Sequence, residues 1–232
     1  MTTSKVLVLG ATGPSGISLL RELLYREHST VAYVRSPSKI PEDISSNPLL
    51  TVIKGDMNDR EALTKALSGV DIVLSLLGPT FGAPISPFED YYRDVVFPAM
   101  RDNNVKRIIA SSTVSAPDPK DSFVLRITLL KLLVRVVAPG AIPSIQAVAK
   151  AFQEEATDFE WTLFRFQNIV GKTDEESFKK DREGVIHAGY VGDSKIAGWS
   201  NRNAIARWVV GLAESGQSEW DKKMPAVGQR SG

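Results

Sequence analysis

The sequence contains no cysteine and only two histidines, His28 and His187. The lack of thiols excludes disulfides, thiolate metal sites and a cysteine nucleophile, and it is typical of a reducing compartment. His28 follows the first expected helix, at the end of the sheet away from any catalytic edge. His187 is interpreted as structural, with substrate contact as the alternative. Two isolated histidines without a carboxylate cluster do not make a metal site, so we expect a cytoplasmic protein without a metal.

The chain also lacks an excess of charge of one sign, since 28 Lys and Arg face 27 Asp and Glu. No global field is therefore available to attract nucleic acid or an anionic membrane. The one long apolar run, 123–139, contains Arg126, Lys131 and Arg135 and is shorter than the roughly 20 residues of a membrane span. We expect a buried or interface helix there. The N-terminus, residues 1–5, has no charged leader with a cleavage site, so neither nucleic acid nor membrane is an expected partner.

Apolar runs alternate with helical patterns along the chain, which fits a single α/β domain over residues 1–232. Such alternation predicts a doubly wound parallel sheet of the Rossmann type. The expected strands are Lys5–Leu9, Thr30–Val34, Leu50–Lys54, Asp71–Leu76, Arg107–Ser111, Trp161–Arg165 and, late in the chain, Gly184–Ala188. The expected helices follow the first strand and cover 88–103, 144–156 and the region around 205–212.

A glycine-rich loop joins the first expected strand to the first expected helix and reads Gly10-Ala-Thr-Gly-Pro-Ser-Gly16. Its three glycines allow a tight turn, a close approach of a pyrophosphate to the backbone, and close packing of helix on strand. The start of the helix offers free N–H groups to phosphate. We therefore expect a dinucleotide to bind Gly10, Thr12, Gly13, Pro14, Ser15 and Gly16, with a purely structural turn as the alternative.

The spelling of this loop resembles that of the extended and atypical short-chain dehydrogenase/reductases, in the branch of the NmrA-like proteins and the biliverdin/flavin reductases. Further landmarks of the resemblance are 55–57, 104–111 and 161–165, and it covers essentially the whole chain. The resemblance implies a cofactor whose adenine lies beside Asp56 and Met57. It also implies that Leu76, Leu77 and Gly78 pass near the cofactor ribose, and that Ser111 lies beside the nicotinamide.

The end of the second strand indicates which dinucleotide is bound. A carboxylate there would bind the 2′-hydroxyl of NAD, whereas a basic residue accommodates the 2′-phosphate of NADP. This chain has Arg35 and Lys39 with Ser36 and Ser38, and no acid. We expect NADP, with a solvated basic loop as the alternative reading.

The sequence indicates the catalytic residues less clearly than the cofactor-binding residues. Many short-chain dehydrogenases use Tyr-x-x-x-Lys, and the corresponding place here is interpreted as Gln146-Ala-Val-Ala-Lys150. The resemblance would put Lys150 near the nicotinamide ribose, but Gln146 cannot deliver a proton. The alternative is that Lys150 pairs with Glu154 on a solvated helix face.

Other polar groups are expected near the same cleft. Ser111 and Ser112 end the fifth strand, while Tyr91 and Tyr92 are more often packing residues in such a position. After the sixth strand come Gln167, Asn168 and Ile169, at the place where the flavin reductase pattern carries a histidine. These three residues are expected to border the cofactor.

The substrate side is expected to consist of 79–87, 114–143 and 171–200, because these segments follow the strand ends. The apolar stretch within 114–143 could wall a pocket, although a core or dimer helix is the more common role of such a stripe. The sequence thus favours an NADPH-dependent reductase of a small, largely aromatic or conjugated molecule, with a homodimer as a further prospect. An NADP-sensing regulator and a cofactor-bound isomerase or cyclase are the alternatives.

Overall fold

Eight strands form one sheet in the computed structural model, which describes residues 4–78, 87–216 and 218–231. Their order is β3-β2-β1-β4-β5-β6-β10-β8. All neighbours are parallel except β8, which runs antiparallel to β10. The strands are β1 Lys5–Leu9, β2 Ser29–Val34, β3 Leu50–Lys54, β4 Ile72–Ser75, β5 Arg107–Thr113, β6 Glu160–Phe166, β8 Ile186–Gly189 and β10 Ala226–Gln229. The expected Rossmann sheet is confirmed.

The strand order reverses beside β1, and this reversal positions the site. The chain runs outward from β1 through β2 to β3 and then returns to place β4 on the other side of β1. The loops that leave β1 and β4 therefore diverge, and a crevice forms at the carboxyl ends of the two strands. Val6, Leu7 and Val8 of β1 are at most 1% exposed, because helices cover both faces of the sheet.

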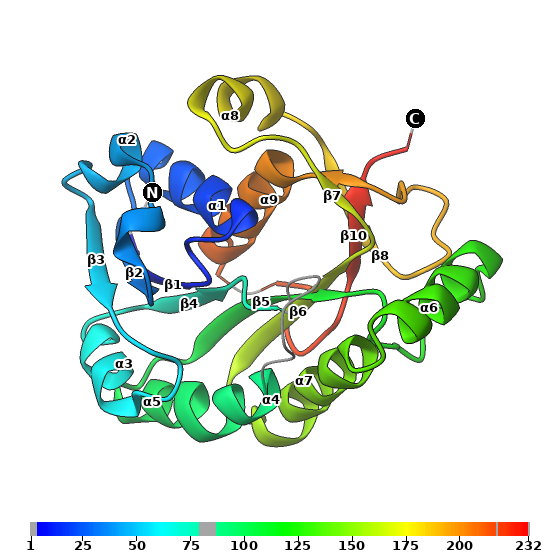
Figure 1. Ribbon diagram of the computed structural model, residues 1–232, viewed down its shortest axis with the longest axis horizontal. Helices are drawn as coiled ribbons and strands as arrows, with labels where there is room; N and C mark the ends of the chain where they lie inside the picture. Colours follow the sequence, from blue (N-terminus) through cyan, green and yellow to red (C-terminus); the bar gives the residue numbers. More distant parts are fainter. Residues whose placement is uncertain (1–3, 79–86, 217, 232) are drawn as a thin grey trace.

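Helices pack on both faces of the sheet (Figure 1). On one face lie α1 and α9, and on the other lie α3, α4, α5 and α7. A π-helical turn, Tyr92–Val96, joins α4 to α5. The helices are α1 Pro14–Tyr25, α2 Glu42–Ser45, α3 Arg60–Ala66, α4 Phe88–Tyr91, α5 Phe97–Asp102, α6 Leu125–Val137, α7 Ala141–Glu155, α8 Glu175–Asp181 and α9 Arg202–Glu214.

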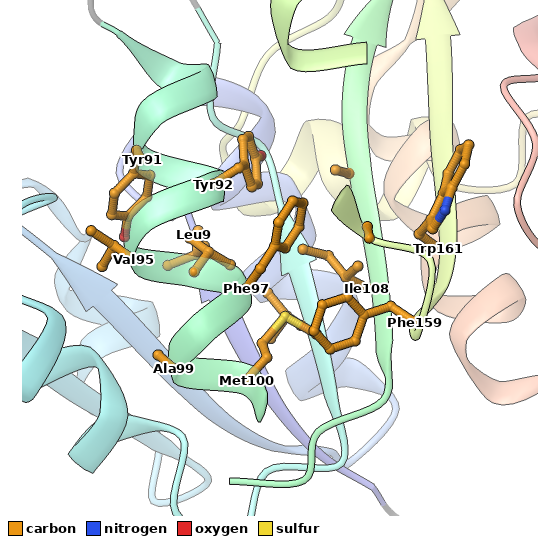
Figure 2. Close-up of a cluster of buried hydrophobic side chains, with 14 of the residues drawn as sticks. Leu9, Tyr91, Tyr92, Val95, Phe97, Ala99, Met100, Ile108, Phe159 and Trp161 are labelled. Carbon is orange, nitrogen blue, oxygen red and sulfur yellow. The ribbon is translucent and has the colours of Figure 1, made fainter. Parts of the chain in front are cut away.

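Aromatic side chains form the core between the sheet and α5 (Figure 2). Tyr92 and Phe97 each pack edge-on against Phe152, with ring centroids 4.9 and 5.2 Å apart. The hydroxyl of Tyr92 lies 2.5 Å from the Ser75 hydroxyl at the end of β4, so this buried polar group has a partner. The core thereby fixes the carboxyl end of β4 next to the crevice.

Two features of the second half differ from the expectation. β10 inserts between β6 and β8, and a separate parallel pair joins β7 Ile169–Val170 to β9 Ser200–Asn201. Helix α6 is not buried, since Ile127 is its one buried residue, and the alternative expectation of an interface helix is untested. It lies at the edge of the molecule beside α7, not in the core (Figure 1). Within the described residues, no helix is long and apolar enough to cross a bilayer.

Candidate functional site

The glycine loop after β1 is built so tightly that side chains cannot replace two of its glycines. Gly10 has φ +76°, and a Cβ there would lie 2.8 Å from the backbone carbonyl of Leu76. A Cβ on Gly16 would lie 2.7 Å from Ala11 backbone atoms and still closer to the Gly10 carbonyl oxygen. Real Cβ atoms do not tolerate such distances. The loop therefore brings α1, β1 and the end of β4 into direct backbone contact, as a phosphate cradle requires.

The start of α1 is free to bind an anion. Gly13 is its N-cap and Pro14 opens the helix, and no side chain caps the first turn or adds an acid to it. The first N–H groups of a helix have no partner within the helix. Here they meet the partial positive charge of the helix end, which favours phosphate. The residues present thus fit a dinucleotide pyrophosphate.

Three neighbouring cavities lie beside this loop along the carboxyl edge of the sheet. The first, of about 320 Å³, is lined by Gly10, Thr12 and Gly13 and reaches the end of β2. The second and third, of about 160 and 150 Å³, both reach Ser111. Gly78 lines all three. Together they form one cleft at the point where the strand order reverses.

The β2 end of the cleft is basic. Arg35 and Lys39 both line the first cavity, and none of the described residues that line it is acidic. Tyr33 lies there too, and its hydroxyl donates to the backbone carbonyl of Asp56 at 2.9 Å. Burial, followed by the charges of Asp59 and Asp56, raises the pKa of Tyr33 to about 12, so this phenol stays neutral.

The residues that the resemblance places near adenine and ribose fall partly in the cleft. Met57, Leu76, Leu77 and Gly78 line it. The side chain of Asp56 instead accepts a hydrogen bond from the amide of Asn58 at 3.1 Å and is absent from the cavity walls. Of the loop residues, Ser15 lines the second cavity, while Pro14 is exposed and Gly16 is buried beneath the loop.

The third cavity is apolar with a strip of hydroxyls. Four residues with hydroxyl side chains line it: Ser111, Ser112 and Thr113 at the end of β5, and Ser144 on α7. Ser144 is only 7% exposed, and its hydroxyl has no hydrogen-bond partner. The remaining walls are carbon, from Leu77, Gly78, Phe88, Ile145, Val148 and Phe166.

The structure places Gln146 and Lys150 outside the walls of the cleft. Ser144 and Val148 are on the side of α7 that lines the cavity. Gln146 and Lys150 each follow two positions later, so they project from another side of the helix. Gln146 is exposed and donates to the carbonyl of Ser115 at 3.3 Å. Lys150 is exposed and lies 3.8 Å from Glu154, as in the alternative reading. Neither residue lines the cleft.

The segment after β6 contributes one of its three expected residues. Ile169 lines the second cavity. Gln167 accepts a hydrogen bond from Arg126 at 3.2 Å, and the carbonyl of Asn168 accepts one from the amide of Ser200. Neither Gln167 nor Asn168 lines the cleft. The hydrogen bonds with Arg126 and Ser200 hold these two residues against α6 and β9 instead.

The histidines and the tyrosine pair are structural in this fold. His28 lies 2.9 Å from Glu214, and His187 lies 2.9 Å from Asp193. Tyr91 and Tyr92 belong to the core cluster, and burial raises the pKa of each phenol. Of the four, Tyr91 also lines the cleft. The described residues hold no group of acids and histidines that could bind a metal.

Arg202 is a cleft residue that the sequence did not reveal. It begins α9 and lines the second cavity together with Ser15. Its Nε donates to the carbonyl of Gly171 at 2.7 Å, and burial lowers the pKa of the guanidinium. No carboxylate within the described ranges forms an ion pair with it. The sequence signal that could have indicated Arg202 is a basic residue immediately after Asn201, the N-cap of α9. The approach of Arg202 to α1, however, depends on tertiary packing, which the sequence pattern does not show.

Other expected substrate-side segments lie apart from these walls. Residues 79–86 fall outside the described part of the chain, so this expectation is untested. No residue of α6 lines any of the described cavities. A hollow of about 700 Å³ lies between α9 and β8, and none of its described lining residues belongs to the glycine loop. The strand-edge cleft is therefore the candidate site.

About a third of this chain is similar in sequence to known plant proteins. Isoflavone reductase homolog P3 of Arabidopsis thaliana is 41% identical over 81 residues, which cover 32% of this chain and 26% of that protein. Phenylcoumaran benzylic ether reductase TP7 of Nicotiana tabacum is 38% identical over 82 residues, with coverages of 32% and 26%. The chain thus matches about a quarter of the length of these relatives.

Solved structures agree over nearly the whole chain. A short-chain dehydrogenase/reductase from Veillonella parvula in complex with NADP has a TM-score of 0.76 and 16% identity, covering 98% of this chain and 95% of that one. An anaerobillin reductase from Escherichia coli O157:H7 has a TM-score of 0.72 and 13% identity, covering 97% of each. At such identities the likeness establishes the fold.

The family model described as NAD(P)H-binding matches residues 10–215, a range that begins at the first glycine of the loop and ends just beyond α9. The matched range includes the phosphate cradle, the basic end of β2 and the β5 edge that lines the cleft. The chain therefore belongs to the NAD(P)H-binding family of Rossmann-fold proteins.

Proposed function

We propose that the protein is an NADPH-dependent reductase of a small, largely aromatic or conjugated molecule. The observation that carries this proposal is the junction at Gly78. This residue lines the cavity beside the glycine loop and also the apolar cavity with the hydroxyl strip. A dinucleotide held by the loop would extend toward this third, apolar cavity. Two relatives whose names denote reductases of aromatic molecules support the same substrate class.

The choice of NADPH over NADH rests on the end of β2. Arg35 is exposed at the strand end, Lys39 lies one turn beyond, and both face the first cavity. A 2′-phosphate placed between a guanidinium and an ammonium gains charge-assisted hydrogen bonds. A 2′-hydroxyl would find no carboxylate to accept its hydrogen bond. The hydrogen bonds gained by the phosphate and the missing acceptor for the hydroxyl both favour NADPH over NADH.

The substrate cavity suits one small ring system. About 150 Å³ of apolar space is enough for a benzene ring, and it lies below the roughly 300–1,000 Å³ of pockets for drug-sized ligands. Phe88 and Phe166 provide flat aromatic walls, while the hydroxyl strip lies along one side. A planar molecule with a single carbonyl or phenolic oxygen matches this distribution.

The hydroxyls would bind that oxygen and stabilise the negative charge that develops on it during reduction. NADPH supplies the hydride when bound, which is the chemistry of the cofactor itself. Among the described residues that line the substrate cavity, none has a side chain that titrates near neutral pH. We propose that water supplies the proton after a hydride adds to a conjugated carbon, because a hydroxyl such as that of Ser112 can orient an oxygen but cannot act as a general acid at neutral pH.

Titration calorimetry with NADPH and NADH tests the cofactor choice. Arg35→Asp should weaken NADPH binding by about 10- to 100-fold, the range lost with a charge-assisted hydrogen bond. NADH binding should stay within about threefold. Lys106→Asp is the matched control, since Lys106 is exposed at the amino end of β5, opposite the cleft. Equal loss of both nucleotides in Arg35→Asp would remove this residue from phosphate recognition.

A panel of quinones, flavins and conjugated carbonyls tests the reaction, with oxidation of NADPH followed by absorbance. The absence of a titrating group from the described cavity walls also favours a second function, an NADP-binding regulator. Turnover of any conjugated acceptor supports the reductase. Tight binding of NADPH with no turnover across the panel would support the regulator instead.

A further inference from the structure

Helix α6 has its hydrophobic face turned outward. At 100° per residue, five apolar side chains fall on the side away from the protein, and all are at least half exposed. They are Leu125, Leu129, Leu132, Leu133 and Val136, with exposed fractions of 61, 56, 50, 57 and 80%. Ile127, Thr128 and Lys131 lie on the buried and half-buried side. This is the reverse of an ordinary surface helix, which turns its polar face to water.

The protein anchors this helix firmly in spite of its exposed face. Ile127 packs with Val114, Val191 and Ala226 in a small core of its own. Arg126 of the first turn donates to Gln167 at 3.2 Å. The outward apolar face is therefore held in place by the fold, and contiguous apolar surface of this kind marks an interaction site.

The charges beside this face have one sign. Arg126 and Arg135 are exposed on its two flanks. The sequence contains no Asp or Glu between Asp121 and Glu154, a stretch that includes all of α6 and nearly all of α7. A basic helix with a strong apolar face is the pattern of a segment that lies in the surface of an anionic bilayer.

A second copy of the chain is a poorer occupant. A two-fold symmetric contact places the same patch on both partners. The α6 faces would then bring the arginines of one copy toward those of the other, with no carboxylate from this stretch to compensate them. Anionic lipid headgroups supply the missing charge, and acyl chains cover the leucines.

We propose that α6 docks the protein on the surface of an anionic bilayer, with the helix parallel to the membrane plane. Its 13 residues span about 20 Å, which suits an interfacial helix and falls short of a membrane span. This inference replaces the expectation that the protein has no membrane partner. It is independent of the reaction proposed above, since no residue of α6 lines the described cavities.

Co-sedimentation with vesicles tests the proposal, using phosphatidylcholine alone and phosphatidylcholine mixed with phosphatidylserine. The wild-type protein should sediment with the anionic vesicles and far less with the neutral ones. Leu133→Glu should weaken this binding at least about tenfold. Val185→Glu is the matched control, because Val185 is 56% exposed, against 57% for Leu133, and lies outside α6. The double variant Arg126→Gln/Arg135→Gln should lose about 30-fold on anionic vesicles.

Circular dichroism and thermal melting confirm that each variant is folded. The proposal fails if the wild-type protein sediments with neither vesicle, or equally with both. It also fails if Leu133→Glu and Val185→Glu bind equally well. A wild-type dimer in sedimentation velocity that Leu133→Glu converts to a monomer, without vesicle binding, would assign the face to a second copy of the chain. Calorimetry with NADPH separates these results from the cofactor site, because the α6 variants should bind the nucleotide normally.

Discussion

The glycine loop yields a sharp prediction, because a Cβ added at one of its glycines would clash with backbone atoms, whereas a Cβ added at another would not. At Gly16 a Cβ would lie 2.7 Å from backbone atoms of Ala11, and backbone cannot turn aside as a flexible side chain can. At Gly13 the nearest atom to a Cβ is the Gly10 carbonyl oxygen at 3.5 Å, an ordinary contact, and φ is −75°. Gly16→Ala and Gly13→Ala are therefore a matched pair in the same loop.

The structure sets the expected size of each effect. Forcing an atom into packed backbone costs about 3 kcal/mol, the upper end of the range for overpacking. For a domain of this length that lowers the melting temperature by about 6–12 °C. Gly13→Ala combines a poorer helix cap with a stiffer unfolded chain, and these effects leave it within about 1 kcal/mol of the wild type.

Thermal melting of the protein without nucleotide, followed by calorimetry with NADPH, measures both consequences. Gly16→Ala should melt well below the wild type and bind NADPH at least about tenfold more weakly, because the displaced backbone forms the cradle. Gly13→Ala should melt close to the wild type. Equal melting of all three proteins would refute the close approach of α1 to β1, and unchanged NADPH binding by Gly16→Ala would refute the role of the cradle.

Three further perturbations test other parts of the structure. Arg202→Gln should weaken dinucleotide binding by about tenfold in calorimetry, whereas Arg207→Gln, on the same helix but paired with Glu183, should not. Ser144→Ala removes an unpaired buried hydroxyl, so it should raise the free energy of unfolding by up to about 1 kcal/mol; a loss of stability would show that the hydroxyl has a partner in the fold. Asp121→Asn should destabilise the fold by about 2–3 kcal/mol in urea titration, because it leaves buried Arg165 without its carboxylate. Burial opposes ionisation of Asp121, yet hydrogen bonds from Arg165 and two backbone amides hold the pKa of its carboxyl below the ordinary value. The stabilisation by the Asp121 carboxylate is therefore complete above about pH 4. It disappears as the pH falls through the lower folded pKa, where the stabilities of wild type and Asp121→Asn should converge.

The sequence predicts those parts of the fold that depend on local signals. The strand Lys5–Leu9 has the predicted bounds, and the following loop has the expected helix behind it. Turn glycines and continuous apolar runs act over a few residues, so they can be read directly. The basic end of β2 is found for the same reason, since it follows immediately on a clear strand.

The face of α7 that lines the cavity could not be found in this way. The expected pair Gln146 and Lys150 has the correct i, i+4 spacing, but the cavity face carries Ser144 and Val148. A helix pattern fixes the spacing of residues, whereas packing on β5 and β6 decides which side faces the sheet. A shift of two positions turns the helix by about 200°, which is enough to move both side chains into solvent.

Long-range pairing explains the remaining differences. The strand Ala226–Gln229 is short and contains a glycine, and it becomes a strand because β6 and β8 lie on its two sides. The apolar pattern of α6 correctly indicates a helix. It does not reveal which face meets the protein, because that depends on the core formed by Ile127 with Val114 and Val191.

The position of β10 also constrains the order in which this protein can fold. Within the described chain, β8 joins the sheet only through β10, and the two strands are separated by the whole of α9. During synthesis, the segment Ile186–Gly189 therefore leaves the ribosome well before its hydrogen-bonding partner exists. Until residues 226–229 emerge, the edge of β6 is open to any other extended chain. A nascent chain halted before that point should be far more prone to aggregate than one halted just after it.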